Sequence, residues 1–324
     1  MPMKPPPQIA RQLQDTALRY FLEVVRCGSI REASQRLNVA ASAISRAIAQ
    51  LEDLLGAQLF DRHARGMIPS AAGETLAVHA LKSAHDAERA VHDIQALQGM
   101  RRGRVRVVST EGFAMEFIPR LVTDFVLQHP GIQFNLGVHP PAECTRRILH
   151  GDADIGVTMS RTPESGVQVE HSQPSPLLAV MRPGHPLTRF KQVSLSQLLA
   201  YPIALPEPDT TVRQLFDIAC SRQRLNFEPV LTSNYIAGLF GFLRHQQDGV
   251  TISGEISIRY QVERGEVACV GLRDRGLDLR NIEVQTLTGR TLSSAAQAFL
   301  QFLKGRLSGQ IPSGAGGVRS AIDG

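Results

Sequence analysis

Hydroxyl side chains stand where several predicted strands end, a position suited to binding a small molecule. Ser109 and Thr110 end the run RVRVVST ahead of a helix, whose first backbone amides favour an anionic ligand group. Thr158 follows the run DIGV, Thr210 begins the helix after YPIALPEPD, and Ser253 follows the run GVTI. We expect all five residues to contact a ligand. Each hydroxyl could instead only cap a helix, which is the simpler role for the last three.

A histidine and two aspartates are further candidates for chemistry. His139 precedes two prolines at a strand end, where it contacts the same ligand or lies exposed in a loop. Asp152 and Asp154, in GDADIG, suggest a catalytic or metal site, but no histidine lies at the spacing that a metal site needs. The chain also lacks the G-x-S-x-G, G-x-G-x-x-G, H-E-x-x-H and P-loop signatures. We therefore expect neither enzyme activity nor a metal or other cofactor.

The cysteines give no sign of a disulfide framework or a thiolate zinc site, because they lie far apart and form no C-x-x-C pair. We expect buried, reduced thiols, and a redox-sensing thiol is the alternative. The residues concerned are Cys27, Cys144, Cys220 and Cys269.

The composition, with 43% hydrophobic and 20% charged residues, is typical of a soluble globular protein. No apolar run reaches the length of a membrane span, and the start MPMKPPPQ has no apolar signal-peptide core, so we expect a cytoplasmic protein without a membrane partner. Through Arg106 the chain has 15 basic and 10 acidic residues, and beyond it 20 of each. This basic excess makes a polyanion partner for the first third plausible, and a solvated surface is the alternative.

Three short helices are predicted between residues 18 and 55. The first carries an apolar stripe that Gly28 ends, and Ser29 with Glu32 fits a capping box for the second, which runs to about Leu37. After the turn NVA at 38–40, the third helix has an apolar face with Ile44 and Ile48. Its outer face is small and lightly charged, and consists of Ser42, Arg46, Ala49 and Asp53 with Ser45 on the flank. This pattern is typical of a helix-turn-helix that enters a major groove, and an ordinary helical hairpin is the alternative.

A basic turn and a further helix follow, and together with the three helices they resemble a known family. Arg62, His63 and Arg65 lie on a short glycine-containing turn that could reach DNA phosphates, or could be a solvated loop. Residues 17–80 resemble the winged helix-turn-helix of LysR-type transcriptional regulators. The resemblance is carried by LRYF at 18–21, GSIREAS at 28–34, AISRAIAQLEDLLGAQLFDR at 43–62 and PSAAGETL at 69–76.

The resemblance implies which residues contact DNA. Ser45 and Arg46 resemble the family's phosphate and base-edge contacts, and Arg62 and Arg65 resemble its wing contacts. Ser42, Gln50 and His63 complete the expected set. Positions 40, 41 and 47 hold alanine where the family more often has Ser or Gln, and a bidentate base contact contributes roughly 1 to 3 kcal/mol of discrimination. We therefore expect a recognition helix that reads few bases directly and depends partly on DNA shape.

A long amphipathic helix is predicted over 71–97, with its apolar stripe at Leu76, Ala80, Ala84, Ala87, Val91, Ile94 and Leu97. Such a stripe could pack on its own domain, but we expect it to pair with a second copy of the chain. The glycines of GMRRGR at 99–104 predict a hinge after it.

Strands and helices alternate over the last two thirds, which predicts parallel sheets covered on both faces. Breaks near 160–180 and 261–270 indicate that the chain leaves one sheet, builds a second and returns. A small ligand would then bind between two lobes. This region also resembles the LysR effector domain, through VRVVST, GDADIGVTM, GHPL and DGVTIS.

The sequence thus predicts a multidomain α+β protein with an all-α winged helix-turn-helix at 15–73 and a linker and dimerisation helix at 71–98. An α/β effector domain resembling periplasmic binding proteins follows at 104–306, with lobe I at about 104–160 and 266–306 and lobe II at about 161–265. Residues 308–324 are Gly- and Ser-rich, and we expect them to form a flexible tail.

The leading functional hypothesis is a LysR-type regulator that binds double-stranded operator DNA as a homodimer or homotetramer and responds to a small-molecule effector. The effector has an anionic group if the helix amides at Ser109 and Thr110 bind it, and RNA polymerase is a further candidate partner. The alternatives are an α/β enzyme or a solute-binding protein, each with an N-terminal interaction module.

Overall fold

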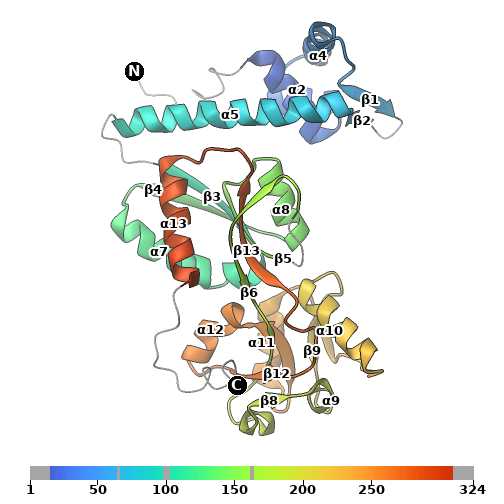
Figure 1. Cartoon of the computed structure of the whole chain (residues 1–324), viewed down its shortest axis with the longest axis vertical. Coiled ribbons are helices and arrows are strands. Elements are labelled where there is room, and N and C mark those ends of the chain that lie inside the picture. Colours follow the sequence, from blue (N-terminus) through green and yellow to red (C-terminus); the bar gives the residue numbers. More distant parts are fainter. Residues whose placement is uncertain (1–14, 64–65, 98–102, 161–163, 309–324) are drawn as a thin grey trace.

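The computed structural model describes residues 15–63, 66–97, 103–160 and 164–308 (Figure 1). Most of the expected hinge at 99–104, and nearly all of the expected tail at 308–324, lie outside these residues. An N-terminal helical unit, a long helix and two lobes follow one another along the longest axis (Figure 1). Among the described residues, no helix has the length and apolar character required to cross a membrane.

The N-terminal unit is a helix-turn-helix followed by a small hairpin. Its elements are α2 (Thr16–Cys27), α3 (Ile30–Leu37), α4 (Ala41–Leu55), β1 (Phe60–His63) and β2 (Gly66–Pro69). Gly28 ends α2 in the left-handed conformation with φ 64°. The Ser29 hydroxyl accepts the Glu32 amide at 3.4 Å, but the Glu32 carboxylate pairs with Arg36, so only half of the expected capping box forms.

The first lobe is built on a five-stranded sheet with the order β4-β3-β5-β13-β6. Its strands are β3 (Gly103–Ser109), β4 (Ile132–Val138), β5 (Ile155–Ser160), β6 (Val167–Pro174) and β13 (Asn281–Leu287). Its helices are α6 (Glu111–Ala114), α7 (Phe117–Gln128), α8 (Pro141–Leu149) and α13 (Ser294–Ser308). One face of the sheet packs on α7 and α13 through Phe125 and Phe299, and the other packs on α8 through Ile148.

The second lobe contains a four-stranded sheet with the order β11-β7-β12-β8 and a separate parallel pair, β9 and β10. The strands are β7 (Leu177–Met181), β8 (Gln192–Val193), β9 (Ala204–Pro206), β10 (Leu231–Ser233), β11 (Val250–Gly254) and β12 (Ala268–Leu272). The helices are the 3-10 helix η1 (Pro186–Arg189), α9 (Leu195–Leu198), α10 (Thr211–Arg222), α11 (Ile236–His245) and α12 (Glu255–Glu263). The core of this lobe is centred on Phe216 and Met181.

The expectation of parallel sheets holds only in part, because both sheets are mixed: β3 pairs parallel with β4 and β5, and β12 pairs parallel with β8. β13 runs antiparallel to β5 and β6, and β7 runs antiparallel to β11 and β12. Residues 175–176 connect β6 to β7, and the turn-containing segment 273–280 connects β12 to β13. Neither connection contains a helix, whereas two parallel strands of one sheet need a long crossover.

The strand pairing also moves the boundaries between the lobes. β6 belongs to the first sheet and β12 to the second, so the chain changes lobe at Ser175 and again between Leu272 and Asn281. The expected changes near 161 and 266 therefore each fall one strand too early. The sequence of β6, VQVEHSQP, is polar and has no continuous apolar stretch, so apolar patterning does not predict this strand.

The long helix α5 (Ala71–Leu97) packs on both of its neighbours in the chain. Its first half joins the core of the N-terminal unit through Leu76, Ala80 and Ala84. Further along, His85 is buried against lobe I, with Nε2 3.2 Å from the Gly151 carbonyl oxygen. Much of the predicted stripe is therefore covered within this chain, whereas Ile94 remains 54% exposed.

Candidate DNA-binding surface and effector pocket

The outer face of α4 carries the residues that the sequence predicts for DNA contact. Ser42, Ser45, Arg46 and Gln50 are all exposed, while Ile44 and Ile48 on the opposite face are buried in the N-terminal core. Figure 1 shows α4 at the end of the molecule farthest from lobe II. Thus α4 presents a surface that a DNA groove can approach without rearrangement of the N-terminal unit.

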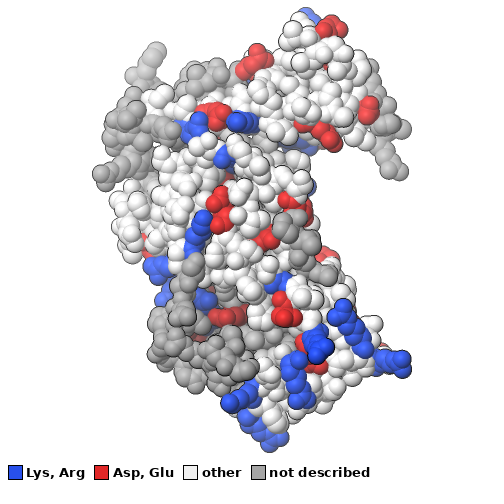
Figure 2. All heavy atoms as spheres, in the orientation of Figure 1, with Lys and Arg blue, Asp and Glu red and all other residues white. Residues whose placement is uncertain are grey.

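Few long or charged side chains lie on this surface. The helix begins after Ala40, which makes no side-chain cap, and Ala49 is exposed on the same side as Arg46. Figure 2 shows a mostly uncharged N-terminal unit on the visible face, whereas Lys and Arg gather over lobe II. The basic excess of the first third is therefore not a broad patch on this face, which leaves individual arginines to supply phosphate attraction.

The hairpin after α4 is held against the helix-turn-helix. The Met67 amide donates to the Gly28 carbonyl oxygen at 2.9 Å, and His63 is the register partner of Gly66. Arg62 and His63 lie on β1, and Arg65 falls outside the described residues. The predicted wing contacts therefore remain predictions.

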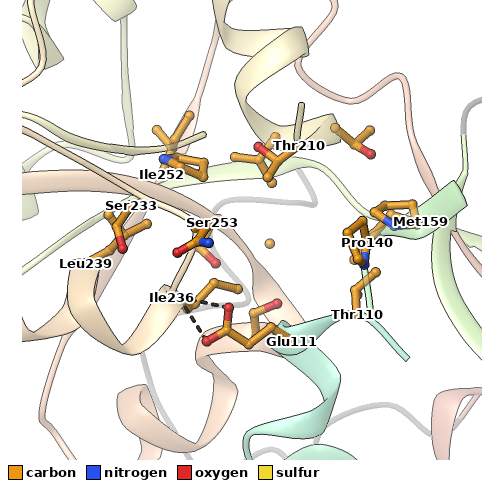
Figure 3. A pocket seen from close by; sticks show the side chains of 18 of the residues that line it. Thr110, Glu111, Pro140, Met159, Thr210, Ser233, Ile236, Leu239, Ile252 and Ser253 are labelled. Atoms are coloured by element: carbon orange, nitrogen blue, oxygen red, sulfur yellow. Dashed lines mark hydrogen bonds between the residues drawn. The ribbon is translucent and has the colours of Figure 1, made fainter. Parts of the chain in front are cut away.

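A pocket of about 340 Å³ lies between the two lobes (Figure 3). Lobe I contributes residues from α6 and from the β4–α8 connection, and lobe II contributes the starts of α10 and α11 and the end of β11. Four helices of nine or more residues, α8, α10, α11 and α12, begin at this pocket. The first amides of a helix carry partial positive charge and favour an anion. Side chains already engage the starts of α10 and α11, whereas the start of α12 has no side-chain cap.

Four of the six residues predicted for ligand contact line the pocket, namely Thr110, His139, Thr210 and Ser253. Thr210 also caps α10: its hydroxyl accepts the Arg213 amide at 3.2 Å and donates to the Glu207 carbonyl oxygen at 2.8 Å. Burial, and next the charge of Arg147, lower the pKa of His139, which favours a neutral imidazole at pH 7.

Ser109 and Thr158 do not line the pocket, which corrects the expectation for both. Ser109 is fully buried, and its hydroxyl donates to the Thr110 carbonyl oxygen at 3.1 Å. Thr158 is buried on β5, where the neighbouring Met159 lines the pocket instead. Side chains alternate along a strand, so counting to the strand end without the register selected the wrong neighbour.

Glu111 and Arg280 also line the pocket, although no sequence motif indicates either residue. The Glu111 carboxylate, on lobe I, accepts the Ile236 amide at the start of α11 on lobe II, at 3.0 and 2.9 Å (Figure 3). Burial raises the pKa of Glu111 in spite of these hydrogen bonds. Ile236 is 125 positions away, so no local pattern marks the pairing.

The surroundings of the four cysteines make their thiols unreactive. Cys144 and Cys220 are buried, and Cys27 and Cys269 are half-buried. Burial raises the pKa of Cys144 and Cys220 to about 12 and that of Cys27 and Cys269 to about 11. A thiol rather than a thiolate therefore prevails at neutral pH, which disfavours the redox-sensor alternative.

A winged helix-turn-helix joined by a long helix to a two-lobed domain with a ligand-sized pocket defines a class of protein, the DNA-binding regulators that respond to a small molecule. Comparison with known families agrees. Residues 16–74 match the bacterial regulatory helix-turn-helix proteins of the lysR family, and residues 98–308 match the LysR substrate binding domain. The protein belongs to the LysR family of transcriptional regulators, which are not enzymes.

Relatives match nearly the whole chain. The RuBisCO operon transcriptional regulator of Acidithiobacillus ferrooxidans is 26% identical over 298 residues, covering 88% of this chain and 92% of its own. A full-length OxyR variant from Pseudomonas aeruginosa is 15% identical with a TM-score of 0.63, covering 89% of this chain and 94% of its own. The effector binding domain of QuiR in complex with shikimate is 17% identical with a TM-score of 0.51, covering 63% and 97%. The two structures show that the fold is shared.

Proposed function

We propose that the pocket between the lobes binds the effector of this regulator, and that its occupancy changes how the N-terminal units meet operator DNA. The observation that carries this proposal is the pocket itself, which is bounded by both lobes and lined by the starts of four helices. A ligand that contacts both lobes favours the arrangement in which both sets of contacts form, and so shifts the population of lobe arrangements.

The contact between α5 and lobe I supports transmission of that shift toward the DNA. His85 on α5 lies against Gly151, and Glu88 on α5 lies 3.4 Å from Arg106 on β3. The N-terminal unit is in turn built around the first half of α5. Movement of lobe I therefore moves α5, and with it the orientation of α4.

For the DNA surface we propose Ser42, Ser45, Arg46 and Gln50 on α4 together with Arg62, His63 and Arg65 on the wing. The exposure of the α4 residues and the anchoring of the hairpin at Gly28 support this set. We further propose a homodimer or homotetramer, because paired N-terminal units match paired operator half-sites, and a cytoplasmic protein, because that is where operator DNA lies in bacteria. RNA polymerase is a proposed partner on the same DNA.

The DNA surface is tested by a gel shift of the full-length protein on its own promoter region. Arg46→Ala should weaken binding about 10- to 100-fold, because a charge-assisted contact to a base or phosphate contributes roughly 1 to 3 kcal/mol. Arg182→Gln, an exposed arginine of lobe II, is the matched control and should bind normally. Equal binding by wild type and the Arg46 variant would remove Arg46 from the DNA surface.

The pocket is tested by DNase footprinting in the presence of candidate metabolites. A compound that alters the wild-type footprint should require roughly 10-fold higher concentration with Thr110→Ala or Ser253→Ala if either hydroxyl bonds it. Thr123→Ala, on the exposed side of α7, serves as the control. If no compound that binds the protein alters the footprint, the pocket does not control DNA binding.

A further inference from the structure

The least compensated charge at the pocket belongs to Arg280. This side chain lines the pocket, yet the residue is only 3% exposed. Its Nε donates to the Ser175 carbonyl oxygen at 2.8 Å, while Nη2 is buried and has no hydrogen-bond partner among the described residues. A buried, unsatisfied guanidinium is costly, so its presence in a folded protein needs a reason.

The described residues do not supply a counter-ion. The pKa of Arg280 is lowered to about 10, and burial is the sole cause, without an opposing contribution from a carboxylate. Of the two pocket carboxylates, Glu111 is engaged by the start of α11, and Asp209 is exposed. Arg280 remains protonated at neutral pH, and it places one uncompensated positive charge at the pocket.

The surroundings of the guanidinium can accept an anion. Ser253, Gly254 and Ser257 line the same pocket as Arg280, and Gly254 is the N-cap residue of α12 and makes no side-chain cap. A methyl group at Gly254 would overlap Nη2 of Arg280, so this glycine is what lets the guanidinium approach the backbone at the start of α12. The start of a nine-residue helix and the guanidinium therefore favour negative charge at the same place.

Arg280 also lies where the chain passes between the lobes. Ser175 follows β6 at the first crossing, Arg280 precedes β13 at the last, and the Ser175 amide donates to the Arg280 carbonyl oxygen at 3.0 Å. Gly254 is the last residue of β11 in lobe II and directly precedes α12, whose Ile256 packs in the core of lobe I. Arg280 thus links the two crossings between the lobes and also lies against the residue that precedes α12.

We propose that Arg280 binds an anionic oxygen group of the effector, a carboxylate or a phosphate, and thereby couples ligand charge to the lobe connections. This inference rests on the proposed role of the pocket and adds the chemical class of its ligand. A bound anion offsets the free-energy cost of burying the Arg280 charge where the chain passes between the lobes. The bound state should therefore favour one arrangement of the two lobes.

The test measures thermal unfolding of the full-length protein with probes that differ in charge. Sodium propionate, its uncharged counterpart propionamide and inorganic phosphate are each titrated to tens of millimolar at constant ionic strength. Propionate or phosphate should raise the melting temperature of wild type, because a ligand that binds only the folded state stabilises it. The anion with the greater effect identifies the preferred class. Propionamide should have no effect.

Arg280→Gln and Arg280→Met should lose this stabilisation, with apparent anion affinity about 10- to 100-fold weaker, as expected for a charge-assisted hydrogen bond. Arg182→Gln is the control and should respond like wild type, and circular dichroism of each variant establishes that it folds. The proposal is overturned if both Arg280 variants are stabilised as much as wild type, if propionamide is as effective as the anions, or if neither anion stabilises wild type.

Footprinting separates this result from a failure of the proposed function. If an uncharged metabolite alters the footprint of wild type and of the Arg280 variants alike, the pocket is regulatory but the assignment of Arg280 is wrong. If anions bind through Arg280 and yet no anionic compound alters the footprint, the anion site stands and the regulatory role of the pocket fails.

Discussion

Single side chains beneath α5 show how burial sets charge states in this protein. Asp154 is buried between Arg106, at 2.9 Å, and Arg290, which it contacts directly. The two guanidinium groups offset the cost of burial and lower the pKa of Asp154. The run GDADIG therefore supplies the anionic centre of a structural ion-pair network rather than a catalytic carboxylate. Arg106 extends the network to Glu88 on α5.

His85 makes the stability of the contact between α5 and lobe I depend on pH. Burial, and next the charges of Arg290 and Arg106, lower the pKa of His85 to about 3. Above pH about 6.5 the imidazole is neutral in both the folded and the unfolded chain. Below that value only the unfolded chain takes up a proton, so the contribution of His85 to stability falls with pH until the folded pKa is reached.

We therefore expect His85→Gln to weaken the pH dependence of the free energy of unfolding. Between pH 7.5 and 5.5 wild type should lose about 1 kcal/mol more than the variant, since each unit below 6.5 corresponds to about 1.4 kcal/mol for a fully shifted group. Urea unfolding at the two pH values measures this difference. Identical pH dependence in the two proteins would mean that His85 can be protonated in the folded state.

Helices and hairpins of the N-terminal unit are held by close backbone contacts as well as by apolar stripes. Gly73, in the first turn of α5, lies directly against the backbone of Leu59, and a methyl group there would overlap the Leu59 carbonyl oxygen. Helix propensity alone favours alanine over glycine by about 1 kcal/mol. Packing must outweigh this preference, because the overlap is with backbone that cannot move aside independently.

Gly73→Ala is accordingly expected to destabilise the N-terminal unit by about 1 to 2 kcal/mol in spite of its better helix propensity. Gly305→Ala, in α13, is the matched case: a methyl group there meets nothing within 4 Å, so it should stabilise by about 0.5 to 1 kcal/mol. Thermal unfolding of both variants checks the opposite signs. Stabilisation by both substitutions would show that the contact with Leu59 is loose.

At the scale of the whole molecule, the Glu111 side chain joins the two lobes in addition to the polypeptide connections. Glu111 of lobe I caps the start of α11 in lobe II, and Met115 and Ile258 pack with Ile236 in a small core beside it. The carboxylate already occupies the amides at the start of α11 (Figure 3). An effector anion is therefore directed to the remaining positive sites of the pocket, of which Arg280 is the strongest.

Glu111→Ala should loosen this junction. We expect hydrogen exchange in the first turn of α11 to become about 10-fold faster or more, because a hydrogen bond to a charged acceptor contributes roughly 1.5 to 3 kcal/mol. Glu228→Ala, an exposed carboxylate of lobe II, is the control and should exchange like wild type. Unchanged exchange in the Glu111 variant would show that the two lobes are held by their apolar contacts alone.

Local patterns along the chain were enough to predict the helices of the N-terminal unit, and the resemblance to a known family identified them as a winged helix-turn-helix. Gly28, the Ser29 cap and the buried pair Ile44 and Ile48 act over a few positions, so composition and periodicity reveal them. The same reasoning located four of the six predicted pocket residues, because strand ends meet at one edge of a sheet.

Contacts between residues that lie far apart in the sequence were decided only by the tertiary structure. Arg280 approaches Ser175 from 105 positions away, and Glu111 reaches Ile236 from 125. The face of Thr158 and the direction of β13 depend on which strands pair. Such contacts depend on burial and on strand register, and both are set when all segments of the domain pack together. A short stretch of sequence therefore cannot predict them.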